Sequence, residues 1–177
     1  LKVASHRGAF TLILGHGQSV DNTCVALEPA LLNATEESDW VYIMGLKKAD
    51  TILALDLWQH YTEEQVQGIV RLAYRNLKPG GQLYLAFPDA LAPEIVAMQA
   101  NRAAQNKPAL ALVLDWDTLA SMLQPLGYQV EMLQYHDREG TLHQPAGHQR
   151  LTELLACYSH PMPREGLLIV QATRPEA

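Results

Sequence analysis

Short polar or glycine-rich segments accompany the ends of three apolar runs in the first third of the chain. Gly15-His16-Gly17 follows the run 10–14, Glu28 follows the run 23–27, and Asp56-Leu57-Trp58-Gln59-His60-Tyr61 closes the run 51–57. Glycines let backbone amides approach a ligand closely, and a carboxylate can accept hydrogen bonds from both hydroxyls of a ribose. A tight turn and a solvated strand end would use the same residue types, so the sequence leaves both interpretations open at this point.

Two further groups of polar residues lie later in the chain. Asp89 follows the apolar run 82–87, where it could orient a substrate or cap the next helix, and we favour the cap. The segment 136–148 contains four possible metal ligands: His136, Asp137, His143 and His148. Their spacing fits no standard zinc pattern. We therefore expect no metal site, and we expect residues 136–160 to cover the substrate or to form a subunit contact.

The middle of the chain predicts a scaffold that brings such strand ends together. Thr62-Glu63-Glu64-Gln65 forms a capping box at a helix start. Gly80 and Gly81 give the backbone the freedom to reverse direction after that helix. The run 82–87 (QLYLAF) is too uniformly apolar for a strand with one solvated face. The strand 51–57, the helix 62–77 and the strand 82–87 therefore predict one βαβ unit. The helix would bury one apolar face: Val66, Ile69, Val70, Ala73 and Leu77.

The rest of the sequence continues this alternation. We predict helices at 93–104, which opens with a proline, at 118–126 and at 151–158. Asp115 or Asp117 should cap the second of these helices, Pro125 should distort its last turn and Gly127 should end it. Strands are predicted at 128–135 and 166–173, with a loop at 136–148. The pattern as a whole predicts a single α/β domain over 1–177.

Composition narrows the class of protein. The chain has 177 residues, 48% of them hydrophobic, which is enough for one domain with a substantial core. Lys and Arg number 13 against 19 Asp and Glu, so the net charge is −6, and no clustered basic run suggests nucleic acid. Cys24 and Cys157 have no CxxC partner, and no apolar run is long enough for a secretion signal or a membrane span. We expect a cytoplasmic protein that binds neither nucleic acid nor membrane.

The order of these segments resembles the class I S-adenosylmethionine-dependent methyltransferases. The resemblance rests on "FTLILGHGQ", "VALEPA", "ADTILALDLWQHY", "NLKPGGQLYLAFPD", "LASMLQPLGYQV" and "GLLIVQATRP", and it is greatest for the small, compact predicted methyltransferases of bacteria. It covers nearly the whole chain. It implies a Rossmann-like, doubly wound and mostly parallel sheet of about six to seven strands, with helices on both faces and an antiparallel C-terminal strand.

The resemblance also implies S-adenosylmethionine as cofactor and a role for each strand end. The cofactor would contact the glycine turn, Glu28 and the segment that follows the strand 51–57. Trp58 and Tyr61 could stabilise the sulfonium by ~0.5–2 kcal/mol, or they could simply pack under the following helix. His60 could take a proton from the acceptor, or it could only tie a loop. The implied cofactor residues are Gly15, His16, Gly17, Glu28, Asp56, Leu57 and Trp58, and the candidate catalytic residues are His60 and Asp89.

Three functions remain open on the sequence. The leading hypothesis is methyl transfer to a small-molecule or sugar-type acceptor, by a monomer or a homodimer. The second is a catalytically inactive methyltransferase fold that acts as a binding or assembly module, because His16 stands where the family usually has a small residue. A nucleotide-linked oxidoreductase is third, because the full GxGxxG fingerprint is missing.

Overall fold

The fold is a seven-stranded mixed sheet with helices packed against it, in a computed structural model that describes residues 10–14, 24–27, 33–55, 61–110, 112–145 and 164–176; for 24–27 it describes the backbone alone. The strand order is β2-β1-β3-β4-β7-β5-β6. In chain order, the elements are β1 Thr11–Leu14, β2 Cys24–Leu27, α1 Glu37–Met44, β3 Ala49–Ala54, α2 Glu63–Asn76, β4 Leu77–Pro88, α3 Pro93–Ala104, α4 Trp116–Leu123, η2 Gln124–Leu126, β5 Gln129–His136, β6 Leu142–His143, η3 Arg164–Gly166 and β7 Leu167–Thr173.

The predicted βαβ unit is confirmed. β3 pairs with β4 in parallel, and α2 connects them. Thr62 caps α2, since its side chain accepts a hydrogen bond from the backbone of Gln65 while the Gln65 side chain accepts one from the backbone of Thr62. The apolar residues predicted for this helix face are all buried: Val66, Ile69, Val70, Ala73 and Leu77. Local sequence chemistry therefore fixes this unit, because both the cap and the apolar face are encoded within a few turns.

The direction of the strands sets the position of any site. β1 pairs in parallel with β2 and β3, while β7 runs antiparallel to both β4 and β5. β7 is thus the closing strand that was predicted to run antiparallel, and it lies inside the sheet. In consequence β1, β2, β3, β4 and β5 all end at one edge of the sheet, which we call the carboxyl edge.

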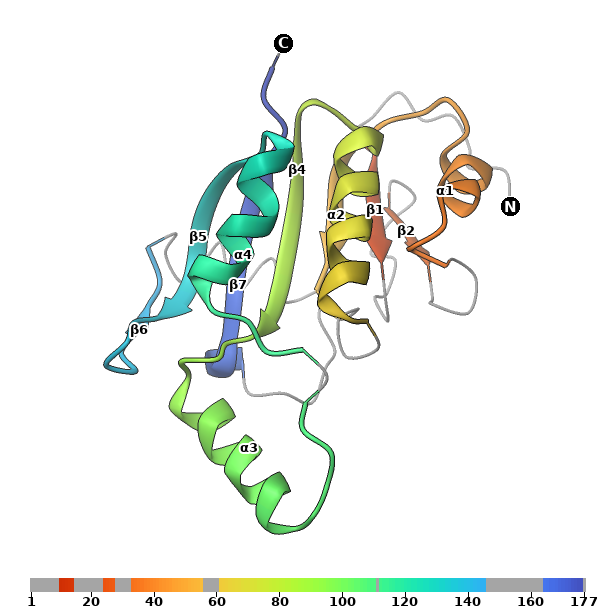
Figure 1. The fold of residues 1–177 in the computed structure, drawn as a ribbon. Helices are drawn as coiled ribbons and strands as arrows, with labels where there is room; N and C mark the ends of the chain where they lie inside the picture. The colour runs from red at the N-terminus through yellow and green to blue at the C-terminus, as the bar shows by residue number, and fades with distance from the viewer. Residues whose placement is uncertain are drawn as a thin grey trace.

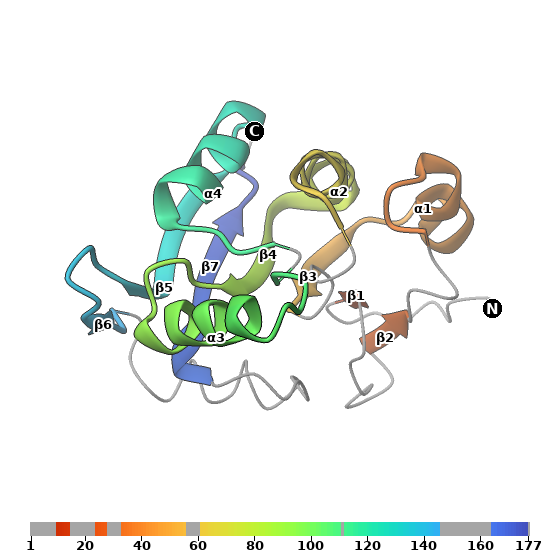
Figure 2. The ribbon, with the colours of Figure 1, turned by 60° about the horizontal axis from the view of Figure 1, so that its bottom comes forward.

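The described helices lie on one side of the sheet and at its carboxyl edge. Figures 1 and 2 show α1, α2 and α4 over the same face, and α3 beyond the carboxyl end of β4. Helices were predicted on both faces, and within the described ranges the second face carries none. This second face nevertheless carries buried apolar side chains. Examples at most 7% exposed are Ile13, Leu53 and Ile169, which alternate along their strands with the residues packed under α2 and α4.

The predicted element boundaries hold for several elements and fail for others. The helix at 93–104 matches α3, Asp115 caps α4, the last turn at Pro125 is a 3₁₀ turn, and Gly127 ends it with φ 93°. α1 was not predicted, and the predicted loop 136–148 contains β6, which pairs with the end of β5. The predicted helix 151–158, Cys157 and the Cys24 side chain lie outside the described part.

In the described part, no helix has the length and apolar character to cross a bilayer.

The glycine pair after α2 does not separate helix from strand, as was predicted, but forms an irregularity inside β4. Leu77 already pairs with Ala49, and the register then shifts before Gln82 pairs with Thr51. Gly80 has φ 75°, and its N–H donates to the Arg174 carbonyl. The chain thus passes through the irregularity without leaving the sheet, because positive φ is accessible to glycine at little cost.

We expect Gly81→Ala to lower the free energy of unfolding by about 1–3 kcal/mol. A Cβ atom at Gly81 would lie 2.8 Å from the Lys78 carbonyl oxygen and 3.2 Å from that of Ala49, and neither backbone group can move easily. The matched control is Gly68→Ala inside α2, where a Cβ atom would meet nothing within 4 Å; this change should raise stability by about 0.5–1 kcal/mol. Urea unfolding of both variants checks the pair, and equal effects would contradict the account.

Candidate functional site

The carboxyl edge is the place where an open α/β sheet binds ligands. The chain leaves β1 for β2 on one side and returns to β3 on the other, so the switch point of the topology lies between β1 and β3. Leu14 pairs with Leu27, and Ile13 pairs with Leu53, so the three strands end at nearly the same level. The carboxyl ends of these three strands therefore lie side by side.

Most of the predicted site residues follow these strand ends in the sequence, and they lie outside the described residues. This holds for Gly15, His16 and Gly17 after β1, for Glu28 after β2, and for Asp56, Leu57, Trp58 and His60 after β3. Their roles stay predictions. The strand ends that precede them are described, and these ends share one edge of the sheet.

Within the predicted segment Trp58–Tyr61, the structure describes Tyr61 alone. It is half-buried and packs against the core. Burial raises the pKa of its hydroxyl above the ordinary value, although a hydrogen bond with the Ala34 backbone acts in the opposite direction. The ring of Tyr61 therefore contributes to the core, and its contact with the sulfonium stays a prediction.

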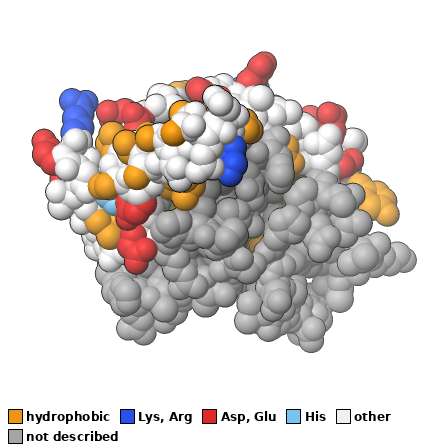
Figure 3. All heavy atoms as spheres, turned by 90° about the horizontal axis from the view of Figure 1, so that it is seen from below, with side chains coloured by type: hydrophobic (Ala, Val, Ile, Leu, Met, Phe, Trp, Pro, Cys, Tyr) orange, Lys and Arg blue, Asp and Glu red, His pale blue; other side chains and the backbone are white. Residues whose placement is uncertain are grey.

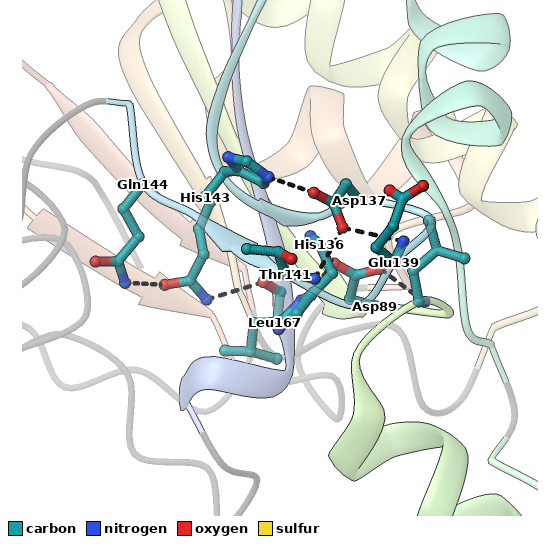
Figure 4. A network of polar contacts seen from close by, with 10 residues as sticks. Asp89, His136, Asp137, Glu139, Thr141, His143, Gln144 and Leu167 are labelled. Carbon is teal, nitrogen blue, oxygen red and sulfur yellow. Dashed lines mark hydrogen bonds and ion pairs between the residues drawn. The ribbon is translucent and has the colours of Figure 1, made fainter.

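Asp89 is almost fully buried at the end of β4, and its carboxylate has three hydrogen-bond partners. Its Oδ2 atom accepts the backbone N–H of His136 at 2.7 Å and lies 3.0 Å from Nδ1 of the His136 ring. Its Oδ1 atom accepts the N–H of Leu91 at 3.0 Å. Asp89 is 1% exposed and His136 4% exposed. Figure 4 shows the carboxylate between the two chain segments that it joins.

The prediction that Asp89 caps the following helix is wrong. α3 begins with Pro93, its N-cap is Ala92, and the cap makes no side-chain hydrogen bond. The reason is spacing: a turn at Ala90 and Leu91 separates Asp89 from the helix, so its carboxylate closes that turn through the Leu91 amide. Its second oxygen is then free to bind β5.

The start of β7 explains how a residue after β4 reaches the end of β5. β7 lies between these two strands, and its first pair joins Leu167 to Pro88. Asp89 lies one residue beyond this pair, where β7 no longer separates its neighbours. On the β5 side, the side-chain amide of Gln134 donates a hydrogen bond to the Leu167 carbonyl at 2.9 Å, which links β5 to the start of β7. The sheet topology thus brings Asp89 and His136 together.

A second carboxylate–histidine pair stands in the hairpin of β5 and β6. Nε2 of His143 lies 2.7 Å from Oδ2 of Asp137, and the His143 ring stacks on Tyr135 with 4.9 Å between centroids. Asp137 also accepts the N–H groups of Glu139 and Thr141, at 3.1 and 2.8 Å. The hydrogen bond from His143 and, after it, that from Thr141 hold the pKa of Asp137 below its ordinary value.

Three of the four possible metal ligands of 136–148 thus lie in two separate carboxylate–histidine pairs. His136 binds Asp89 and His143 binds Asp137, while His148 lies outside the described residues. In the described ranges no three His, Cys, Asp or Glu residues gather in a way that could hold an ion. The described part of the predicted loop, 136–145, instead contains a hairpin fixed by side-chain hydrogen bonds.

Sequence reasoning missed the partnership of Asp89 with His136. The two residues are 47 positions apart, and nothing local links them. The only signal was that Asp89 follows a buried strand and that His136 ends another, which places both at one edge of a parallel sheet.

Side chains of mixed character cover the described part of the carboxyl-edge face. Figure 3 shows apolar side chains among acidic and basic ones there. Val96 of α3, which is 55% exposed, is one of four large hydrophobic residues that are well exposed in the described ranges.

Comparisons with solved structures identify the fold. An O-methyltransferase family protein from Burkholderia thailandensis matches 97% of this chain and 52% of its own length, with TM-score 0.57 and 11% identity. Magnesium protoporphyrin IX methyltransferase from Synechocystis PCC 6803, with bound S-adenosylhomocysteine, matches 94% of this chain and 74% of its own length, with TM-score 0.55 and 12% identity. A possible histamine N-methyltransferase from Thermotoga maritima matches 96% and 84%, with TM-score 0.53 and 13% identity.

Sequence comparison adds nothing to this result. No family model matches the chain, and no curated protein matches it. The chain spans about half the length of the Burkholderia protein, at 52%. At identities of 11–13%, the likeness is one of fold.

We expect Asp89→Ala to lower the free energy of unfolding by about 3–5 kcal/mol. The change leaves the His136 and Leu91 amides and the buried imidazole without their acceptor. The control is Glu139→Ala, which removes an exposed carboxylate in the neighbouring turn and should stay within about 0.5 kcal/mol of the parent. Chemical denaturation measures both, and a small loss for Asp89→Ala would show that the pair is not a structural tie.

We expect His143→Phe to raise the pKa of Asp137 toward ~3.9. The variant keeps a ring on Tyr135 and removes the nitrogen that binds Asp137. A lowered pKa means that Asp137 stabilises the fold above ~3.9, and that this contribution is lost as pH falls through the folded-state value. NMR titration of the carboxyl carbons measures the change. Asp115, whose pKa is lowered by Thr118, serves as internal control; an unmoved Asp137 would refute the assignment of cause.

β7 runs antiparallel between β4 and β5, as the resemblance in the sequence implied for the C-terminal strand. The chain therefore has the fold of the class I S-adenosylmethionine-dependent methyltransferases.

Proposed function

We propose that this protein is an S-adenosylmethionine-dependent methyltransferase that acts on a small-molecule or sugar-type acceptor. The proposal rests on one observation: β1, β2 and β3 end at nearly the same level, at the switch point of a methyltransferase fold. Ligand sites of open α/β sheets lie at this point. The Synechocystis neighbour holds S-adenosylhomocysteine.

The proposed cofactor contacts come from the three segments that follow these strands. Backbone amides of Gly15, His16 and Gly17 would approach the cofactor, Glu28 would accept the ribose hydroxyls, and Asp56, Leu57 and Trp58 would line it. The bound cofactor supplies an activated methyl group on a sulfonium. The chain's own task is then to orient the acceptor, which can contribute ~7–11 kcal/mol to lowering the barrier.

Two polar residues are proposed to act on the acceptor. His60 would take the proton that the attacking oxygen or nitrogen loses. Asp89 would orient the acceptor indirectly, since both its carboxylate oxygens are already bonded within the fold. The acceptor would approach from the carboxyl edge, where Asp89 follows β4.

The alternative is a methyltransferase fold without activity, used as a binding or assembly module. The observation in its favour is His16, an imidazole in a turn where the family usually has a small side chain. In that case the fold would keep the Asp89–His136 tie but would bind no cofactor.

Thermal-shift and calorimetric measurements with S-adenosylmethionine, S-adenosylhomocysteine and NADH test the proposal. We expect both adenosyl compounds to raise the melting temperature, because a ligand at 100 times its Kd stabilises the native state by ~2.7 kcal/mol. We expect no shift with NADH. Glu28→Ala should weaken the binding of both adenosyl compounds, and Glu139→Ala should not. Failure of both compounds to bind at millimolar concentration would favour the inactive module, and a shift with NADH alone would favour an oxidoreductase.

A further inference from the structure

Exposed apolar side chains gather on α1 and on the turn that follows it. Four large hydrophobic side chains are well exposed in the described ranges, and three of them lie within six residues: Val41 at 60%, Tyr42 at 81% and Leu46 at 100%. Single exposed hydrophobic residues are ordinary at a protein surface, whereas neighbouring ones mark an interaction site. The clustering therefore indicates that this surface meets a partner.

The exposed side chains form one face of the helix, opposite to the face that it buries. Trp40 and Met44 point into the core. The exposed residues recur at the helical spacing of three and four positions and continue into the turn. We call them the outer α1 face: Ser38, Val41, Tyr42, Gly45 and Leu46. Small residues flank the two large side chains of the helix, so another helix can approach closely.

Contacts on the inner side of α1 hold this face outward. Trp40 is 1% exposed, and its Nε1 atom donates to the Ala34 carbonyl at 2.9 Å. The Glu37 carboxylate lies 3.2 Å from the guanidinium of Arg75 in α2. The outer α1 face is thus presented by a helix that is already in place, which lowers the ordering cost of binding a partner.

The charges at the two ends of α1 have opposite signs. Three acidic residues stand at its start, and two lysines follow its end: Glu36, Glu37, Asp39, Lys47 and Lys48. A two-fold axis perpendicular to α1 would bring a second copy of the helix against the first in the antiparallel direction. The acidic start of each helix would then face the lysines of the other. Because a two-fold interface uses the same surface twice, this charge pattern is complementary to itself.

We propose that the outer α1 face binds a second copy of this chain, in a two-fold symmetric dimer with the two α1 helices antiparallel. With the axis between Val41 and Tyr42, Val41 lies beside Tyr42 of the second copy, and Glu36 lies beside Lys47 of the second copy. The apolar pair forms the centre of the interface and the charged pairs form its rim, as is usual in protein interfaces.

The position of α1 makes this dimer compatible with a site at the carboxyl edge. Figures 1 and 2 show α1 near β1 and β2, at the end of the strand order opposite to β5 and β6. An eight-residue helix is ~12 Å long, so its face is smaller than a standard interface of ~1,200–2,000 Å². We therefore expect a reversible dimer with a Kd on the order of 10 μM.

Sedimentation velocity of the whole chain, at concentrations from well below to well above this Kd, tests the dimer without any cofactor. Tyr42→Glu should raise the Kd at least about tenfold, because it sets two carboxylates beside each other across the axis. Val96→Glu is the matched control: it changes an exposed hydrophobic residue of α3 in the same way, and it should dimerise as the parent does. A parent that stays monomeric throughout would overturn the proposal, as would a dimer that only Val96→Glu weakens.

An exchange of charges tests the antiparallel arrangement. Glu36→Lys and Lys47→Glu should each dimerise severalfold more weakly than the parent, because each sets like charges together at both ends of the interface. The side chain of Glu36 makes no capping hydrogen bond that the change would remove. An equimolar mixture of the two variants should recover the affinity of the parent, since every end again has opposite charges. A mixture no tighter than either variant alone would contradict the antiparallel pairing.

Hydroxyl-radical labelling of Tyr42 distinguishes a second copy from other occupants of the outer α1 face. The proposal predicts that labelling falls as the protein concentration rises through the Kd. Weak labelling at every concentration would mean that the chain covers its own α1, and strong labelling at every concentration would mean that no second copy binds there. Either result would overturn the proposal, and neither would count against the proposed methyl transfer.

Discussion

A single buried carboxylate joins three parts of the carboxyl edge, and the geometry of that edge depends on it. Asp89 takes the Leu91 amide on one oxygen and the backbone and ring of His136 on the other. A buried carboxylate is tolerated only when its hydrogen bonds are made, so these contacts are mutually required. The end of β4, the turn before α3 and the end of β5 are held in register as a result.

The inserted strand β7 makes this connection possible and separates the edge into two parts. β7 fills the space between β4 and β5 along most of their length and begins only at Leu167. On one side of it, β1, β2 and β3 end together at the switch point. On the other side of β7, the edge carries two hydrogen-bonded carboxylate–histidine pairs, Asp89–His136 and Asp137–His143.

Local chemistry made much of the fold predictable. The capping box at Thr62, the proline that opens α3 and the glycine that ends η2 each act over a few residues. α1 was missed because it buries only Trp40 and Met44 while Val41 and Tyr42 face solvent, which leaves no clear apolar period. The partner of Asp89 was missed for another reason: the contact spans 47 positions and follows from where β7 begins, which no local pattern reveals.

The central claim is that the adenosyl cofactor binds at the carboxyl ends of β1, β2 and β3. Hydrogen exchange measured by mass spectrometry, with and without S-adenosylhomocysteine, tests it most directly. The account predicts slower exchange in peptides that cover 11–17, 24–28 and 51–60, and little change at the amino end of the sheet around Gly80 and Arg174. Protection confined to the amino end, or to α1, would contradict it.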